Sequence, residues 1–495
     1  MTMASEGDLK EAVATQANGR SAPRPIYVAG EWVRTGAPLA VAVPTAPDEP
    51  FAHTFLAGPG EYERAAAGAL AAVKPLAELA AYERGDALRA VSSGILARHE
   101  ELSRQLAAEA GKPIRDARVE MQRGALAFRL AAEEAERVYG EVMPLDLNAA
   151  SRGRVAIVRR FPIGAIAAIS PFNLPIGLAV HKVAPALAVG CPVVLKPPSA
   201  TPLTMLSIAE LVAETGLPSG SLSVIPMGRD LGDTMVADRR FKLLTFTGSP
   251  DVGWALKQRA GNKKVVLELG SNAAAIVDET ADIDWAVTRC VYGGFKYAGQ
   301  LCVSVQRVFV HDSVYDEFVE PFVARTQTLK VGDPLDEGSD VGPMIDLGAA
   351  RRINAWIDEA AADGASVLLR GATDGTLVEP SILADVPRAA KVWREEAFGP
   401  VVSIARFTDI SEALDGVNDS RFGLQAGIFT NNLEHAWRAF GELEVGGVIV
   451  NDAPTYRIDN MPFGGVKDSG LGREGMRYAI EDMTELRTLV LAGRT

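Results

Sequence analysis

The sequence predicts an α/β protein whose chain forms two lobes, each built on a doubly wound parallel sheet. Three observations lead to this prediction. With 495 residues the chain exceeds the size of one ordinary domain. Short apolar runs alternate with helical segments from Ile163 to Leu269, which is the pattern of repeated βαβ units. The same alternation resumes at Ala273 and continues to Val450, so a second α/β lobe follows the first.

Composition and charge narrow the class of protein. Hydrophobic residues make up 48% of the chain, which excludes a disordered protein. The net charge of −13 argues against nucleic acid or an anionic membrane as partner. Three cysteines are too few for a disulfide framework, and the five histidines show no HExxH spacing, so we expect a reducing compartment and no metal site. Residues 1–25 form a polar leader without a signal-peptide core, and no apolar run is long enough to span a membrane, which predicts a soluble, cytoplasmic protein.

The chain before Ile163 is expected to open with a strand pair at 26–34. Alanine, leucine and glutamate recur at helical spacing over 60–139, and Gly111-Lys112-Pro113 interrupts the pattern between two helices. A turn-rich connection is expected over 140–150. Weak alternation of apolar and polar residues over 154–159 then predicts an exposed strand.

Apolar and helical runs together predict the elements of both lobes. In the first lobe we expect strands at 164–169, 192–195, 222–226, 243–246 and 264–269, separated by helices at 175–189, 202–215, 231–237 and 252–260. In the second lobe we expect strands at 273–277, 308–310, 401–405, 426–429 and 447–450, with helices at 283–297 and 314–329. The terminal apolar strand at 486–491 needs a sheet to pair with, and an open edge there would favour association through strands.

The stretch Gly299-Gln300-Leu301-Cys302-Val303-Ser304 places one cysteine between a helical run and a strand. Its thiol could be a nucleophile, or the residue could pack as a small buried hydrophobe. No histidine is near in sequence, although distance in sequence does not exclude a Cys/His pair in the fold. A papain-type cysteine hydrolase is therefore the rival enzyme class.

Polar residues at the ends of the buried strands are the next candidates, because parallel sheets bind ligands there. Asn173 could stabilise an oxyanion or form an Asx turn. Glu268 stands in an apolar strand, where burial would raise its pKa and suit it to general-base work, unless it forms a structural ion pair. Lys196 could face the ligand crevice or be a solvated lysine at a strand end. Ser199, close by, could donate to a ribose hydroxyl or a 2′-phosphate.

Two glycine-containing stretches have different interpretations. The stretch 246–253 follows a strand and opens a helix, so Gly248 and Ser249 could bind phosphate at the helix N-terminus, or Ser249 could be an ordinary helix cap. The GxGxxG match at 470–475 is not a dinucleotide fingerprint, because it follows a polar loop and too few residues remain for a βαβ unit. We interpret it as a turn before a helix at 476–483.

Seven stretches, taken in their order along the chain, resemble the NAD(P)-dependent aldehyde dehydrogenase superfamily. They are Ser170-Pro171-Phe172-Asn173-Leu174-Pro175, Leu195-Lys196-Pro197, Phe246-Thr247-Gly248-Ser249, Leu267-Glu268-Leu269-Gly270, Gly299-Gln300-Leu301-Cys302, Glu395-Glu396-Ala397-Phe398-Gly399-Pro400 and Met461-Pro462-Phe463-Gly464-Gly465-Val466-Lys467. The resemblance extends from about Ile26 to Leu491. The chain is most similar to the branch of lactaldehyde, semialdehyde and phosphonoacetaldehyde dehydrogenases.

This resemblance implies a mechanism. Cys302 would attack the aldehyde and form a thiohemiacetal, while Asn173 and the backbone N–H of Cys302 hold the oxyanion. Hydride transfer to the nicotinamide of NAD or NADP would leave a thioester, which water activated by Glu268 would hydrolyse to the acid. Ser271 stands where the family often has a second glycine, and Ser199 stands where NAD-selective members often carry glutamate, so NADP is not excluded.

The resemblance also implies how the chain is divided and where it binds the cofactor. A nucleotide-binding domain would comprise 26–141 and 161–270, a catalytic domain 271–476, and an oligomerisation arm 142–160 and 477–495, giving a homodimer or homotetramer. Lys196 and Glu396 would bind the ribose groups. Ser249 would bind the pyrophosphate, and Phe398 would lie beside the nicotinamide. The full set of cofactor-binding residues that the resemblance implies is Ile169, Ser170, Phe172, Lys196, Ser199, Gly228, Gly248, Ser249, Leu269, Glu396 and Phe398.

The similar branch oxidises small hydroxy-aldehydes, semialdehydes and phosphonate- or phosphate-bearing aldehydes. Arg123 and Arg457 could clamp such an anion, or could form salt bridges. Leu301 places no cation directly before the nucleophile, which disfavours glyceraldehyde 3-phosphate relative to a smaller or less charged substrate. Besides the hydrolase, the alternatives are a CoA-acylating dehydrogenase, against which Glu268 argues, and a repurposed protein that binds without catalysis.

Overall fold

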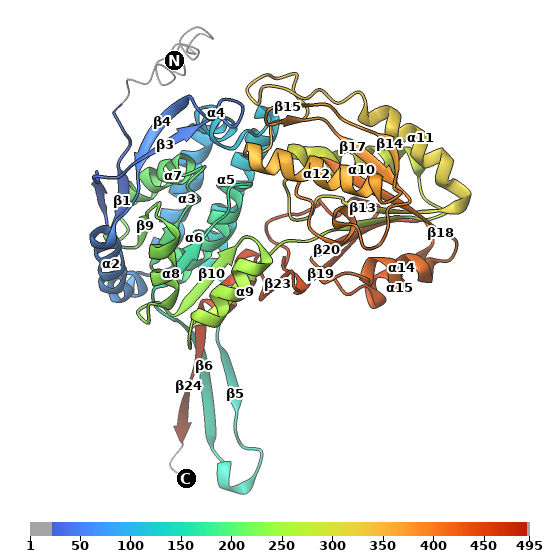
Figure 1. Cartoon of the computed structure of the whole chain (residues 1–495). Coiled ribbons are helices and arrows are strands. Elements are labelled where there is room, and N and C mark those ends of the chain that lie inside the picture. The colour runs from blue at the N-terminus through green and yellow to red at the C-terminus, as the bar shows by residue number, and fades with distance from the viewer. Residues whose placement is uncertain (1–21, 493–495) are drawn as a thin grey trace.

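Two layered α/β lobes and a narrow projecting β arm make up the molecule (Figure 1). The computed structural model describes residues 22–492, so most of the leader expected over 1–25 lies outside the described residues. One lobe contains an eight-stranded sheet and the other a seven-stranded sheet. The α/β fold class with two mainly parallel sheets is thereby confirmed.

The first sheet has the strand order β2-β1-β9-β8-β7-β10-β11-β23. Its parallel centre comprises β7 (Ile166–Ile169), β8 (Val193–Lys196), β9 (Leu222–Val224), β10 (Leu243–Thr247) and β11 (Lys264–Glu268). The antiparallel edge strands are β1 (Ile26–Val28), β2 (Glu31–Val33) and β23 (Gly470–Leu471). The chain adds strands on one side of β7 and then on the other, so the order reverses between β7 and β10. Ligands bind beyond the carboxyl ends of strands at such a switch point.

Helices cover both faces of this sheet. They are α2 (Pro59–Glu78), α3 (Ala81–Ala97), α4 (His99–Ala110), α5 (Ile114–Ala135), α6 (Gly177–Val189), α7 (Leu203–Ala213), α8 (Arg229–Ala237), α9 (Pro250–Arg259) and α16 (Met476–Asp482). Successive side chains of a strand point to opposite faces. Ile166 and Ala168 therefore pack in one buried cluster with α5 and α6, and Ala167 packs in another with α2. Gly111 ends α4 in the left-handed conformation, at the interruption expected there.

The second sheet has the order β14-β17-β18-β13-β12-β20-β21 and is parallel except for β14. Its strands are β12 (Ala274–Val277), β13 (Arg307–His311), β14 (Ser366–Leu369), β17 (Ser381–Ala384), β18 (Val401–Phe407), β20 (Gln425–Phe429) and β21 (Gly447–Val450). The helices are α10 (Ile283–Phe295), α11 (Tyr315–Thr326), α12 (Leu347–Ala362), α13 (Lys391–Arg394), α14 (Ile410–Asn418) and α15 (Leu433–Glu442). A helix expected over 283–297 ends at Phe295, because Tyr297, Ala298 and Gly299 adopt positive φ angles of 51°, 53° and 69°.

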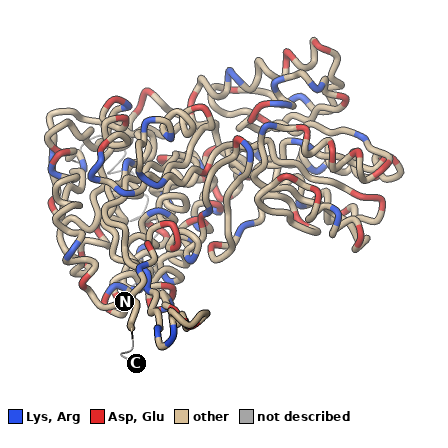
Figure 2. Tube along the Cα trace, turned by 90° about the horizontal axis from the view of Figure 1, so that it is seen from below, with Lys and Arg blue, Asp and Glu red and all other residues tan. Residues whose placement is uncertain are grey.

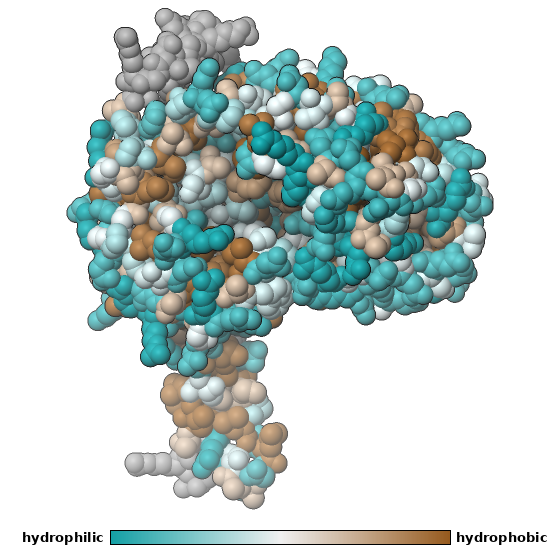
Figure 3. Space-filling view, viewed as in Figure 1, coloured by the Kyte–Doolittle hydropathy of each residue, from teal (hydrophilic) through white to brown (hydrophobic). Residues whose placement is uncertain are grey.

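The arm is a three-stranded antiparallel sheet of β5 (Glu141–Pro144), β6 (Arg154–Pro162) and β24 (Thr484–Ala492), with a 3₁₀ turn at Ala149–Ser151. The turn-rich connection expected over 140–150 is therefore wrong in part, because Val142 and Met143 pair with β6. Hydrophobic side chains gather on the arm (Figure 3), and Val142 is 73% exposed. Three short ladders complete the structure: β3 (Pro38–Ala42) with β4 (Pro50–Phe55), β15 (Thr373–Asp374) with β16 (Leu377–Val378), and β19 (Phe422–Gly423) with β22 (Val466–Lys467).

Over the residues that the structure describes, acidic and basic residues are interspersed, and no single basic tract stands out (Figure 2). No helix within residues 22–492 is long and apolar enough to cross a membrane. The GxGxxG stretch lies at the edge of the first sheet, where Gly470 and Leu471 form β23 instead of the expected turn. The expected helix follows it as α16. The domain boundaries implied by the resemblance stay a prediction.

Candidate active site

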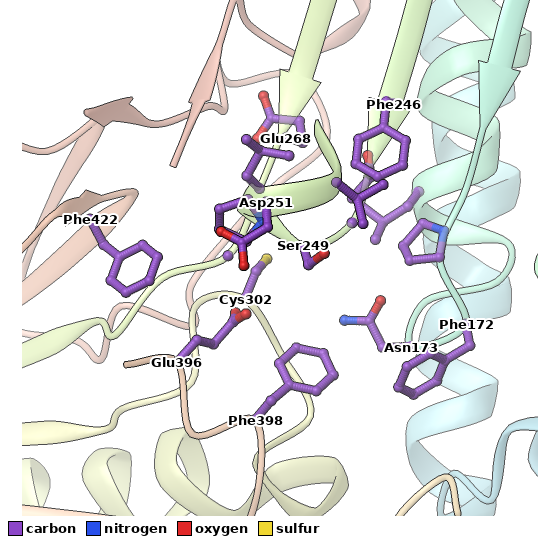
Figure 4. Close-up of a pocket in the computed structure, with 18 of the residues that line it drawn as sticks. Phe172, Asn173, Phe246, Ser249, Asp251, Glu268, Cys302, Glu396, Phe398 and Phe422 are labelled. Atoms are coloured by element: carbon purple, nitrogen blue, oxygen red, sulfur yellow. The ribbon is translucent and has the colours of Figure 1, made fainter. Parts of the chain in front are cut away.

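A cavity of about 650 Å³ opens at the carboxyl ends of β7, β10 and β11 and is closed by loops of the second lobe (Figure 4). Cys302, Glu268 and Asn173 all line it, although they come from separate parts of the chain. The other lining residues expected from the sequence are Ile169, Ser170, Phe172, Gly248, Ser249, Leu269, Glu396 and Phe398. The fold thus brings the three candidate catalytic residues and eight candidate cofactor residues to one place.

The loop that carries Cys302 is anchored by buried hydrogen bonds. Gln300 is fully buried; its amide donates to the carbonyl of Pro343 at 3.1 Å and accepts from the N–H of Ile345 at 2.8 Å. The side chain of Cys302 packs against the cluster of Val303, Leu424 and Phe463. Its sulfur points into the cavity (Figure 4). Burial, with the nearby charge of Glu396, raises the pKa of the Cys302 thiol to about 12. A thiol is a nucleophile only as the thiolate, so this raised pKa keeps Cys302 in its less reactive form.

Asn173 lies beside this loop. Its side-chain amide donates to the carbonyl of Gln300 at 3.0 Å, and the residue is only 3% exposed. Its acceptor, Gln300, is two residues before Cys302, so the amide lies close to the thiol at the edge of the cavity (Figure 4). An Asx turn was the alternative interpretation, but this side chain reaches a residue 127 positions away. A fixed N–H donor in this place can stabilise negative charge on a carbonyl oxygen.

Glu268 ends β11, and both of its carboxyl oxygens are buried without a hydrogen-bond partner among the described residues. Burial, together with the negative charge of Glu474, raises its pKa well above the ordinary value. A Cβ atom at Gly464 would lie 2.7 Å from one carboxyl oxygen, so glycine there leaves room for this side chain. The structural ion pair considered for Glu268 does not occur among residues 22–492, and an unpaired buried carboxyl suits a general base.

A buried charge cluster beside Glu268 escaped sequence reasoning. The ammonium group of Lys182 donates to Glu474 at 3.0 Å and to Thr247 at 2.7 Å, and Arg457 donates to the other oxygen of Glu474 at 3.0 Å. Although burial opposes ionisation, the charges of Lys182 and Arg457 lower the pKa of Glu474 to about 2. A lysine next to a histidine in the otherwise apolar α6 was the signal that could have found it.

The strand ends also fit a dinucleotide. A second cavity of about 390 Å³ shares Ile169 and Phe246 with the first and is lined by Lys196 and Arg229. The ammonium group of Lys196 forms no ion pair within the described chain, and burial lowers its pKa. Ser249 precedes α9 without using its hydroxyl as a cap, which leaves the helix N-terminus open to a phosphate. Glu396 accepts the N–H of Ser271 at 3.1 Å, and burial raises its pKa to about 7.

Other candidate residues lie outside the main cavity. Ser199 is exposed in the loop after β8, and Gly228 is the N-cap of α8. Leu301 is buried and lines a small adjoining cavity. Arg123 pairs with Asp459 at 2.7 Å. The binding roles expected for Ser199, Gly228, Leu301 and Arg123 stay predictions. The main cavity also has lining residues that sequence reasoning missed, namely Arg352, Trp356, Arg421 and Phe422.

Comparisons with known proteins agree with this geometry. Residues 32–489 match the model of the aldehyde dehydrogenase family. The 3-sulfolactaldehyde dehydrogenase of Priestia megaterium is 45% identical over 467 residues, which are 94% of this chain and 97% of that protein. Aldehyde dehydrogenase 21 from Physcomitrella patens, solved in complex with the reaction product succinate, is 44% identical, with a TM-score of 0.93 over 95% of this chain and 99% of that one. The glyceraldehyde-3-phosphate dehydrogenase GapN from Methanocaldococcus jannaschii, solved with NADP, is 37% identical, with a TM-score of 0.88 over 92% and 99%.

A crevice at the switch point of a parallel sheet, next to a partly buried thiol, is typical of α/β enzymes that bind a nucleotide cofactor. The chain belongs to the aldehyde dehydrogenase family. It is an NAD(P)-dependent enzyme, and the resemblance stated from the seven stretches is confirmed.

Proposed function

We propose that this enzyme oxidises a short aldehyde bearing an anionic or hydroxyl group to the carboxylic acid, with Cys302 as nucleophile and Glu268 as general base. The observation that carries the proposal is the meeting of Cys302, Asn173 and Glu268 in one cavity beside the dinucleotide crevice. A thiol, an oxyanion donor and a base are the groups that acyl chemistry on a cysteine requires.

The steps on the protein follow from this arrangement. The thiol of Cys302 loses its proton to solvent, and the sulfur forms a bond to the aldehyde carbon. The C=O π bond breaks, and the amide of Asn173 stabilises the negative charge that develops on the oxygen. Lys196, Ser249 and Glu396 are the residues that would hold NAD or NADP, which when bound would supply the acceptor for the hydride of the Cys302 adduct. Glu268 then takes a proton from water, the hydroxide adds to the thioester, and the thiolate of Cys302 leaves with release of the acid.

Two observations support an anionic or hydroxylated substrate. The names of similar proteins include 3-sulfolactaldehyde and lactaldehyde dehydrogenases, and one similar structure contains succinate. Within this chain, the guanidinium of Arg457 stacks on Phe463 at 3.8 Å, and its charge acts on both Cys302 and Glu268. The Nε atom of Arg457 is buried without a partner in the described part of the chain, which leaves one donor for a substrate anion, although Arg457 is not among the residues that line the main cavity.

We expect the change Arg457→Lys to raise KM for an anionic aldehyde by about 10- to 100-fold, because a lysine keeps the charge but loses the planar fork. The ratio of kcat/KM for succinate semialdehyde to that for propanal measures the effect, since propanal reports any general damage to the site. Arg240→Lys is the matched control, because the Arg240 guanidinium pairs with Glu63 and Asp238 and lines neither cavity. An unchanged ratio in Arg457→Lys would mean that this arginine does not bind the substrate.

The proposed reaction is tested with a panel of small aldehydes and both cofactors. We expect an aldehyde-dependent rise in NAD(P)H absorbance, with the free acid as product whether or not CoA is present. Formation of an acyl-CoA would favour the CoA-acylating alternative. Absence of any rise across the panel would count against an oxidation and in favour of a cofactor-free hydrolase.

The proposal includes a homodimer or homotetramer in the cytoplasm. The strands β5 and β24 form the open edges of the arm sheet and expose apolar side chains to solvent. Contact with another copy of the chain would cover both, which supports association. Cys191, Cys290 and Cys302 are all free thiols, which supports a reducing compartment.

A further inference from the structure

Lys112 is a buried cation whose partners come from three separate segments. Its ammonium group donates to the carboxylate of Glu120 on α5 and, at 2.7 Å, to the backbone carbonyl of Asn173. It also lies 4.6 Å from the centre of the Tyr297 ring. Lys112 and Glu120 are 2% and 4% exposed, and neither lines the substrate cavity. The pair therefore contacts residues next to the cavity, namely Asn173 and Tyr297, but does not enter the cavity itself.

Glu120 holds the other end of the segment that carries Asn173. One of its oxygens accepts the backbone N–H groups of Ile176 and Gly177, at 3.2 and 3.0 Å, where α6 begins. A carboxylate is favourable at a helix N-terminus. Since Lys112 binds the carbonyl at residue 173 and Glu120 binds the amides at 176 and 177, the ion pair holds the backbone over residues 173–177 at both ends.

Tyr297 connects the same lysine to the nucleophile loop. Its hydroxyl donates to the carbonyl of Ala110, next to the segment that carries Lys112. Tyr297 begins the run of three positive φ angles that leads to Cys302. Lys112 therefore contacts the backbone of the oxyanion donor on one side and the start of the nucleophile loop on the other.

A buried ion pair is costly to desolvate, and replacing it with apolar residues is often neutral or stabilising. A contribution to folding stability therefore does not explain why Lys112 and Glu120 are both charged and buried. We propose that Lys112 and Glu120 are positioning residues, which hold the side-chain amide of Asn173 at the place where the oxyanion forms on the Cys302 adduct. This role rests on the proposed function.

The test is a double-mutant cycle between the pair and Asn173. The variant Lys112→Met with Glu120→Gln leaves no unpaired charge buried. We expect it to lower the single-turnover rate of NAD(P)H formation by about 10- to 100-fold, while dinucleotide binding, measured by fluorescence, is unchanged. In an Asn173→Ala background the same replacement should lower the rate by less than about threefold, because the group through which the pair acts is already gone.

The neighbouring pair Lys296–Asp116, with a separation of 3.2 Å, is the matched control. It connects α5 to the residue before Tyr297 but has no bond to Asn173. Any loss in Asp116→Asn should therefore be equal in both backgrounds.

Equal losses for Lys112→Met with Glu120→Gln in the two backgrounds, or a normal rate in that variant, would overturn the positioning role. If the double replacement does not fold, Glu120→Gln alone is taken through the same cycle, with the same two outcomes. An inactive wild type would count against the proposed function instead, so the two failures are distinguishable.

Discussion

Replacing Cys302 with alanine is expected to abolish aldehyde oxidation while binding of NAD or NADP survives. Without the sulfur no covalent adduct forms, and the residual rate should fall by on the order of 10⁴-fold or more. Dinucleotide binding should persist because its candidate residues, such as Lys196 and Ser249, belong to the strand ends of the first sheet. Steady-state assays and cofactor titration by fluorescence measure the two quantities separately.

Cys290→Ala is the matched control for this experiment. Cys290 is a fully buried cysteine on α10 that does not line the cavity, and burial raises its pKa. Its replacement should cost little activity. If Cys302→Ala lost cofactor binding as well as turnover, the side chain would be structural rather than a nucleophile.

Replacing Glu268 with alanine is expected to separate the two halves of the reaction. One equivalent of NAD(P)H should still form in a rapid burst, because hydride leaves before water is needed. Hydrolysis should then slow by about 10²- to 10⁴-fold, and the acyl group should accumulate on Cys302. Rapid-quench kinetics follow the burst, and mass spectrometry of the quenched protein detects the thioester. A normal rate of deacylation in this variant would exclude Glu268 as the base.

The pH dependence of deacylation provides a second measurement on the same residue. Burial and the charge of Glu474 raise the pKa of Glu268, so this carboxyl needs a higher pH to ionise than an ordinary glutamate does. The fraction of carboxylate, and with it the deacylation rate, should rise about tenfold for each pH unit below that pKa. Glu268→Gln, which keeps the shape of the side chain, should lose this dependence.

The sequence was sufficient for the strands of the first lobe because they are buried on both faces and appear as apolar runs, as in Val193–Lys196. It was less informative for β5, a four-residue strand that depends on pairing with β6 for its structure. The exposed apolar residue Val142 gives no local signal for a strand, and its conformation depends on the pairing of β5 with β6 in the arm.

A site residue could be predicted from the sequence where its immediate neighbours made it stand out. Asn173 and Glu268 could be found because each polar side chain interrupts an apolar or proline-bracketed stretch at a strand end. Lys182 and Glu474 are separated by 292 positions, and only the folded chain brings them together. The hydrogen bond of Asn173 to Gln300 is likewise a property of the fold, since it spans the two lobes.

The left-handed run from Tyr297 to Gly299 has a consequence for how the enzyme is made. Such backbone is unfavourable for tyrosine and alanine, and it persists only where neighbouring structure holds it. Part of that structure is Pro343 and Ile345, which bind Gln300 and leave the ribosome after Cys302 does. Cys302 is therefore synthesised before the residues that hold its loop in this conformation.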